Sequence, residues 1–72
     1  MNKFRITIAS LPDRENLVAE ISYENRQIAE ISQETDKLII QIYSHLNKYW
    51  EFDLEEFQNV IEKAKQRLIE VG

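Results

Sequence analysis

The sequence predicts an α+β fold, in which an antiparallel meander sheet of four to five strands carries one C-terminal helix packed on one face. Two observations predict it. Apolar and polar residues alternate with a period of two along residues 3–43, as in strands with one buried face. Along residues 53–72 the apolar positions recur at spacings of three and four, as in a helix with one buried face.

Four segments alternate in this way, and short polar stretches join them, so we expect a meander. The expected strands are residues 3–9, 17–24, 28–33 and 38–43. Residues 10–16 contain the only proline of the chain and form a loop. The residues expected to face the helix are Phe4, Ile6, Ile8, Leu17, Ala19, Ile21, Tyr23, Ala29, Ile31, Leu38, Ile40 and Ile42.

The alternation also constrains the hairpin registers, because a shift of one residue turns the apolar face of a strand outward. In the second hairpin we expect Ile21 opposite Ile31, with residues 25–27 as a three-residue loop. In the third hairpin we expect Ile31 opposite Ile40, with a four-residue loop at residues 34–37.

The C-terminal helix is expected to begin at Asp53, because Asp53 and Glu56 have the spacing of a capping box. Residues 49–52 form a candidate fifth strand before it, with Trp50 and Phe52 on the core side. The stripe expected to face the sheet is Leu54, Phe57, Val60, Ile61, Ala64, Leu68 and Val71, with Gly72 able to end the helix.

Length and charge bound the class of protein. The chain has 72 residues, no cysteine and a net charge of −4, so we expect one domain, residues 1–72, without disulfides. The acidic balance argues against direct nucleic-acid binding, which uses a basic patch. It permits a protein partner with a basic surface, which we expect. The alternative is that a small acidic balance keeps the protein soluble. No apolar run is long enough for a membrane span, and no signal-peptide pattern opens the chain, so we expect a cytoplasmic protein without a membrane partner.

No residue pattern indicates catalysis, and we expect no enzymatic activity, no cofactor and no metal. His45 is the only histidine and follows Ser44. A catalytic role would need a nucleophile and a carboxylate arranged around its ring. The alternative, which we expect, is a solvent-exposed loop histidine. A single histidine without cysteine does not make a zinc site, and Glu34–Asp36 lacks the glycine of a calcium loop.

The candidate binding site lies on the outer face of the sheet, opposite the expected helix. Four apolar residues fall out of phase with the core set, namely Val18, Ile28, Ile39 and Tyr43. An exposed apolar cluster with a charged rim is typical of an interaction surface. The alternative is that scattered surface aliphatics are normal in strands. The predicted partner-binding residues are Tyr43, Ile28, Glu20, Glu24, Glu30 and Arg5.

The run RITIASLPDRENLVAEI, from Arg5 to Ile21, followed by EISQE, from Glu30 to Glu34, resembles a group of short uncharacterised bacterial proteins. This resemblance covers most of the chain and implies no chemistry. In size and architecture, an acidic meander plus helix is similar to toxin-immunity proteins and phage anti-defence proteins, including anti-CRISPR inhibitors. That likeness implies a small acidic module that inhibits a partner by occluding it, in one form by mimicking DNA phosphates. The alternative is a structural subunit that forms a homodimer through the apolar patch or a sheet edge.

Overall fold

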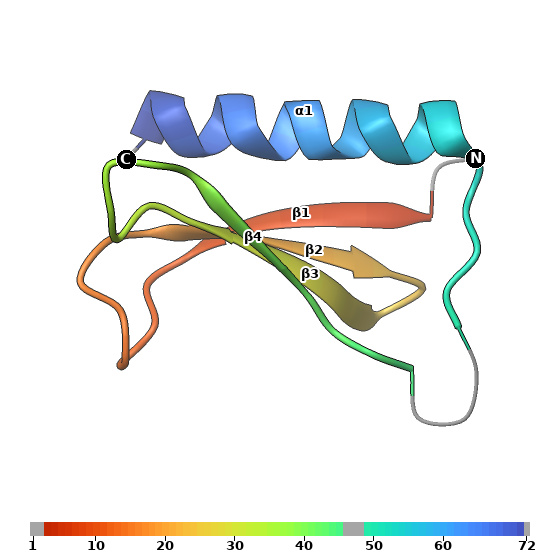
Figure 1. The fold of residues 1–72 in the computed structure, drawn as a ribbon, viewed down its shortest axis with the longest axis horizontal. Helices are drawn as coiled ribbons and strands as arrows, with labels where there is room; N and C mark the ends of the chain where they lie inside the picture. Colours follow the sequence, from red (N-terminus) through yellow and green to blue (C-terminus); the bar gives the residue numbers. More distant parts are fainter. Residues whose placement is uncertain (1–2, 46–48, 72) are drawn as a thin grey trace.

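A computed structural model describes residues 3–45 and 49–71 of the chain. Its elements follow one another as β1 (Phe4–Ala9), β2 (Val18–Tyr23), β3 (Arg26–Ser32), β4 (Ile39–Ile42) and α1 (Leu54–Val71). The strands are antiparallel neighbours in the order β1-β2-β3-β4. Helix α1 lies along one face of this sheet (Figure 1). The predicted meander with one C-terminal helix is therefore confirmed, with four strands.

The turn between β2 and β3 differs from the expected three-residue loop. Glu24 and Asn25 alone connect Tyr23 to Arg26, and both have positive φ, 49° and 70°. Two consecutive left-handed residues make the type I′ turn that fits the twist of a two-residue hairpin. The turn therefore begins one residue earlier than residues 25–27.

A β-bulge in the same hairpin then corrects the alternation of faces. Ser22 pairs with Gln27, but the next pair is Ile21 with Ala29, so Ile28 is an extra residue on β3. Ile21 consequently faces Ala29, whereas the expected partner was Ile31. The requirement that Ile21 have an apolar partner on the core side is met, but by a bulge and not by the loop length.

The third hairpin has the predicted register. Ile31 lies opposite Ile40, and Ala29 lies opposite Ile42. The Tyr43 amide donates to the Ile28 carbonyl at 2.9 Å, which continues the same register by one more pair. The alternation of β4 thus suffices to place it correctly against β3.

Helix α1 has the predicted N-terminal cap. The Asp53 carboxylate accepts a hydrogen bond from the Glu56 amide at 2.9 Å, and the Asp53 carbonyl accepts one from the Phe57 amide at 2.9 Å. These bonds satisfy amide groups that have no partner inside the helix. The helix has 18 residues, and Gly72, which was expected to end it, lies outside the described residues.

The core lies between α1 and the first three strands. Its buried members are Ala19, Ile21, Ile28, Ala29, Ile31, Val60, Ala64 and Leu68. Residues 49–52 form no strand, so the expected fifth strand is wrong, although Trp50 and Phe52 do pack on the core. Phe4, Tyr23, Phe52 and Phe57 form an aromatic cluster with neighbouring ring centroids 4.8–5.2 Å apart, a geometry that adds stability beyond area burial.

Part of the apolar surface that was expected to be buried remains exposed. Helix α1 makes its main contacts with β1 and β2, and all four residues of β4 are exposed. A helix is about 10 Å wide, while strands lie about 4.8 Å apart, so one helix covers about two strands. The expected core residues that are exposed are Leu38, Ile40, Ile42, Leu54 and Val71.

Candidate functional site

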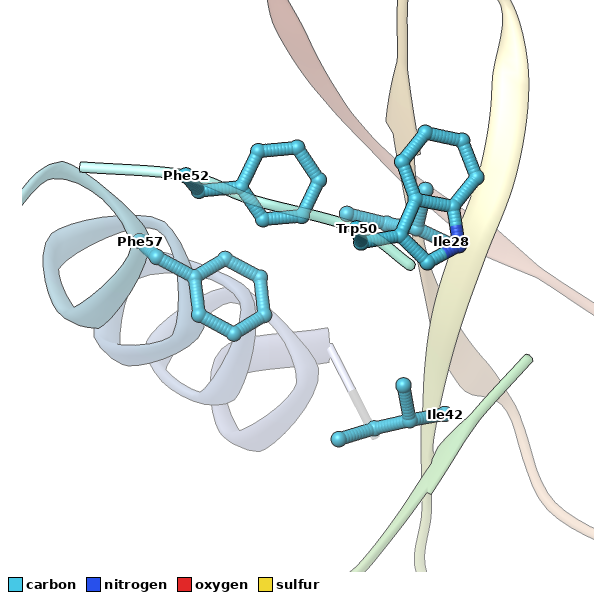
Figure 2. A pocket seen from close by; sticks show the side chains of 5 residues that line it. All are labelled: Ile28, Ile42, Trp50, Phe52 and Phe57. Carbon is cyan, nitrogen blue, oxygen red and sulfur yellow. The ribbon is translucent and has the colours of Figure 1, made fainter. Parts of the chain in front are cut away.

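The outer face of the sheet, turned away from α1, does not carry the predicted apolar cluster. Ile28 is only 1% exposed and points toward α1 (Figure 2). The bulge is the physical reason, because the inserted Ile28 and the following Ala29 both join the core. Val18 is also fully buried, Tyr43 is half-buried, and Ile39 is left as the exposed apolar residue of the four. The placement of Ile28 as an accessible binding anchor is therefore wrong.

Instead, the outer face carries a polar network centred on Glu30. Glu30 is 4% exposed, and its carboxylate pairs with the Arg14 guanidinium at 2.9 Å. The Tyr43 hydroxyl donates to the same carboxylate at 3.1 Å, and Arg14 also donates to Gln41 at 3.3 Å. The network therefore ties the β1–β2 loop to β3 and β4.

Burial and the Glu30 contact together raise the pKa of Tyr43. Burial disfavours the phenolate, and the nearby carboxylate both accepts the hydroxyl hydrogen bond and repels a second negative charge. Tyr43 and Glu30, two of the predicted partner-binding residues, are thus brought together, but they contact each other within the protein.

Arg14 was not among the predicted site residues, although it is central to this face. Its sequence context is a proline-containing polar loop, which predicts exposure. Glu30 gives no such signal either, because it alternates with Ala29 and Ile31 along β3, a pattern that predicts an exposed carboxylate. Only the folded structure shows that Glu30 is buried and needs a cationic or hydrogen-bonding partner.

A second set of contacts holds the loop that carries Arg14. The Glu34 carboxylate accepts hydrogen bonds from the Glu15 amide at 2.8 Å and the Asn16 amide at 2.9 Å. These two bonds lower the pKa of Glu34, since they stabilise its charged form. The β1–β2 loop is therefore attached to the β3–β4 loop as well as to the sheet.

The other predicted site residues are more scattered. Glu20 accepts a hydrogen bond from Gln27 at 3.1 Å. Glu24 lies in the β2–β3 turn and pairs with Lys3 at 3.7 Å, where both side chains are exposed and the pair contributes little to stability. Arg5 is exposed on β1. The structure places Glu20, which lies opposite Glu30 and adds negative charge near Tyr43, beside this network, but it does not bring Glu24 or Arg5 there.

An exposed apolar surface lies on the helix side of the sheet, between β4 and α1. We name it the β4 groove and define it by Ile40 and Ile42 of β4 and Phe57 and Ile61 of α1. Ile40 and Ile42 are 40% and 61% exposed, although they pair with the buried residues Ile31 and Ala29.

Two cavities lie along the β4 groove. One, of about 270 Å³, is lined by Ile28, Ile42, Trp50, Phe52 and Phe57. Figure 2 shows Ile28 and Ile42 pointing from the sheet toward the rings of Phe52 and Phe57. The other, of about 190 Å³, is lined by Ile31, Leu38, Ile39, Ile40, Ile61 and Lys65. Both linings are almost entirely apolar, and both cavities open to solvent.

One flank of α1 extends the groove beyond these cavities. Phe57, Ile61 and Lys65 line the cavities, and they are spaced four residues apart along one side of the helix. Leu54 and Ile69 continue the same row at each end, and they are 69% and 55% exposed. The flank is therefore a second apolar stripe of α1, distinct from the stripe of Val60, Ala64 and Leu68 that covers the sheet.

His45 does not lie free in solvent as expected. It is half-buried, with its ring edge-on to Trp50 at 4.8 Å and its Nε2 3.3 Å from an Arg26 Nη1. Trp50 in turn donates to the Tyr43 carbonyl at 3.2 Å. These described contacts of His45 include neither the nucleophile nor the carboxylate of a catalytic triad.

Metal sites, membrane-spanning helices and similarity to known proteins were also considered. Among residues 3–45 and 49–71, no three or more histidine, aspartate or glutamate side chains are grouped so as to hold a metal ion. In the same described part of the chain, no helix combines the length and apolarity needed to cross a membrane. Comparison with family models, curated proteins and solved structures gave no match.

Proposed function

We propose that the protein is a non-enzymatic protein-binding module that occludes a functional surface of its partner. The observation that supports this proposal is the β4 groove, where exposed isoleucines and two apolar cavities lie side by side. Contiguous apolar surface of this kind is uncommon on proteins that bind nothing. The binding surface of the proposal is therefore the helix side of β4 and not the outer face.

The occupant that fits the β4 groove best is an amphipathic helix of the partner protein. A four-stranded sheet has room for two helices on one face, and this sheet carries one. A partner helix beside α1 would complete the layer. It would contact Ile40 and Ile42 below and the Leu54–Ile69 flank of α1 at its side.

The spacing along the groove also suits a helix. Phe57 and Ile61, which each line one cavity, lie about 6 Å apart on α1 because they are one turn apart. Ile42 and Ile40, across the groove, lie about 7 Å apart because they are two residues apart on a strand. Apolar side chains at positions i and i+4 of a partner helix would reach one cavity each, as in other helix-in-groove complexes.

The charge of the groove rim favours a basic partner helix. Two carboxylates, Glu55 and Glu62, are exposed on α1 in the row next to the groove flank, against one cation, Lys65, in the groove lining. The chain also carries a net charge of −4. Lysine or arginine residues beside the apolar anchors of the partner would meet these carboxylates. Such complementarity raises association rates and disfavours acidic competitors.

This proposal keeps the inhibitor class predicted from the sequence and moves its contact surface. An acidic module that captures a helix needed in its partner's own assembly would block that assembly, which is the mode of action proposed for an immunity or anti-defence type of inhibitor. Tyr43 and Glu30 then support the fold from the opposite face and do not touch the partner, whereas Ile28 lines the cavity that one partner side chain would enter.

Site-specific photo-crosslinking in cells of the native host tests the surface. A benzoyl-phenylalanine at Ile42 is expected to crosslink to a helical segment of one protein, identified by mass spectrometry. The matched control carries the same residue at Arg5, which is exposed on the opposite face of the sheet. Crosslinking from position 5 and none from position 42 would return the interface to the outer face and overturn the proposal. Absence of crosslinks from both positions would overturn protein binding itself.

A further inference from the structure

The free edge of β4 is a second interaction surface, formed by backbone groups and not by the groove side chains. The Tyr43 amide donates to β3, at the Ile28 carbonyl. Backbone groups alternate in direction along an antiparallel strand, so those of Gln41 and Ile39 also point to β3. The amide and carbonyl groups of Ile40 and Ile42 therefore point away from the sheet. Within the residues that the structure describes, nothing hydrogen-bonds them.

We propose that β4 pairs with β4 of a second copy of this chain, giving a two-fold dimer with one continuous antiparallel sheet. A strand edge with unpaired amides and carbonyls is a template for another strand. The dimer would join two four-stranded sheets. The inference goes beyond the proposed function, because it uses the strand edge and leaves the groove free.

The side chains of β4 suit pairing with themselves. Residues 38–43, LIIQIY, contain no charged side chain, so two antiparallel copies meet without like-charge repulsion. Ile40 and Ile42 of each copy would form one apolar ladder on the helix side. On the outer side, Gln41 would lie among Ile39 and Tyr43. An acidic or basic strand could not pair with its own copy so readily.

Strand geometry restricts the register of such a dimer. Only residues whose backbone points outward can exchange hydrogen bonds, so even-numbered residues must pair with even-numbered residues. Two registers bring the centres of β4 together. In the first register, Ile40 lies opposite Ile42 of the second copy, and Gln41 lies opposite Gln41 of the second copy. In the second register, Ile40 lies opposite Ile40 of the second copy.

Both helices would lie on the same face of the joined sheet, because the two-fold axis of an antiparallel pair is perpendicular to the sheet. Each α1 lies over β1 and β2 of its own copy. Six strand spacings would therefore separate the two helices, about 29 Å. That distance is far greater than helix packing distances of about 8–10 Å. The two β4 grooves would remain open beside each other, and binding of a partner helix would remain compatible with the dimer.

Disulfide trapping tests the inference cleanly, because the natural chain has no cysteine. In the first register, Gln41→Cys places two cysteines in a non-hydrogen-bonded pair with Cα atoms about 4.5 Å apart, within disulfide range. In the second register, Ile40→Cys does so at about 5.5 Å. Asn59→Cys, exposed on α1 away from β4, is the control. We expect one of the two β4 variants to form a covalent dimer at least tenfold faster than Asn59→Cys at micromolar concentration.

Sedimentation equilibrium of the unmodified chain supplies the second measurement. A dimer in the micromolar range, weakened at least tenfold by Ile40→Pro and less by Ile40→Ala, supports edge pairing, since the proline removes only an outward amide. Two results together would overturn the inference: the unmodified chain is a monomer at 100 µM, and neither β4 cysteine variant forms a covalent dimer faster than Asn59→Cys. Circular dichroism of each variant identifies loss of fold. The cysteine variants retain every backbone amide, so their result stands even if the proline variant unfolds.

Discussion

The two edge strands of the sheet, β1 and β4, differ in how far charges and the helix protect them. At β1, the Arg67 side chain of α1 donates to the outward Ile6 carbonyl at 3.4 Å, and Lys3 and Arg5 add exposed charge. At β4, the strand is uncharged, lies beyond the helix and is exposed at every residue. Proteins commonly protect edge strands with charges or with a covering element. This difference between a protected and a bare edge is the observation behind the proposed pairing of β4 with a second copy.

Small residues and an aromatic cluster lie where α1 meets the first strands. Ala19 of β2 and Ala64 of α1 are both fully buried, and small side chains allow a helix and a sheet to approach closely. On β4 the corresponding inward positions are Ile40 and Ile42. The aromatic cluster of Phe4, Tyr23, Phe52 and Phe57 holds the start of α1 at the same side of the sheet. The covered half thus has a small residue at Ala19, although its other inward residues, such as Ile6 and Ile21, are as large as those of β4.

The largest expected effect compares two isoleucines on that face. Ile21→Ala removes a side chain that is 0% exposed on β2, and it should lower the free energy of unfolding by about 2–5 kcal/mol. Ile42→Ala removes one that is 61% exposed on β4, and it should change that free energy by about 0.5 kcal/mol or less. Urea denaturation monitored by Trp50 fluorescence measures both. Equal losses would mean that β4 is covered in the monomer and that the groove is not open.

An intermediate effect compares the two arginines that contact the edges. Arg14→Ala leaves the Glu30 carboxylate buried without its cation, and it should lower the free energy of unfolding by about 1–3 kcal/mol. Arg67→Ala removes one exposed bond to β1 and should stay within about 0.5 kcal/mol. Hydrogen exchange should show faster exchange in β4 for Arg14→Ala, because its contacts to Glu30 and Gln41 are lost. If Arg67→Ala were the more damaging of the two, the polar network would not be what holds β4.

The smallest expected effect concerns Tyr43, next to the free edge. Its folded-state pKa is raised above the ordinary value of 10.0. The stabilisation that the protonated Tyr43 hydroxyl gives to the fold is therefore complete below the pKa of Tyr43 in the unfolded chain. It is lost as pH rises through the pKa of Tyr43 in the folded chain. Tyr43→Phe should lower the free energy of unfolding by about 1 kcal/mol at pH 7. The difference between the variant and the natural chain should shrink above pH 10. Urea midpoints at pH 7 and above pH 10 decide this, and a constant difference would show that the pKa of Tyr43 is the same in the folded and the unfolded chain.

Much of the fold was predictable from the sequence, because each element carries its own amphipathic period. Alternation located the four strands, and the pairing of Ile31 with Ile40 followed from it. The spacing of three and four located α1, and Asp53 marked its start. These features depend on neighbours within a few residues, so local pattern is enough to identify them.

The candidate site was less predictable, because it depends on which elements cover which. The bulge that turns Ile28 into the core is decided by how β2 and β3 pair around a two-residue turn. The Arg14–Glu30 pair joins residues from a loop and a strand that only the folded chain brings together. Neither leaves a periodic signal in the sequence.

By itself, the sequence determined the order of the four strands and the helix, the face that most of their residues turn toward the core, and the register of β4. Only the tertiary structure decided that α1 covers β1 and β2 and leaves the isoleucines of β4 exposed. The physical reason is that a hydrophobic period shows which side of an element prefers burial. Whether another element reaches that side depends on widths and distances in three dimensions, and one helix is too narrow for four strands.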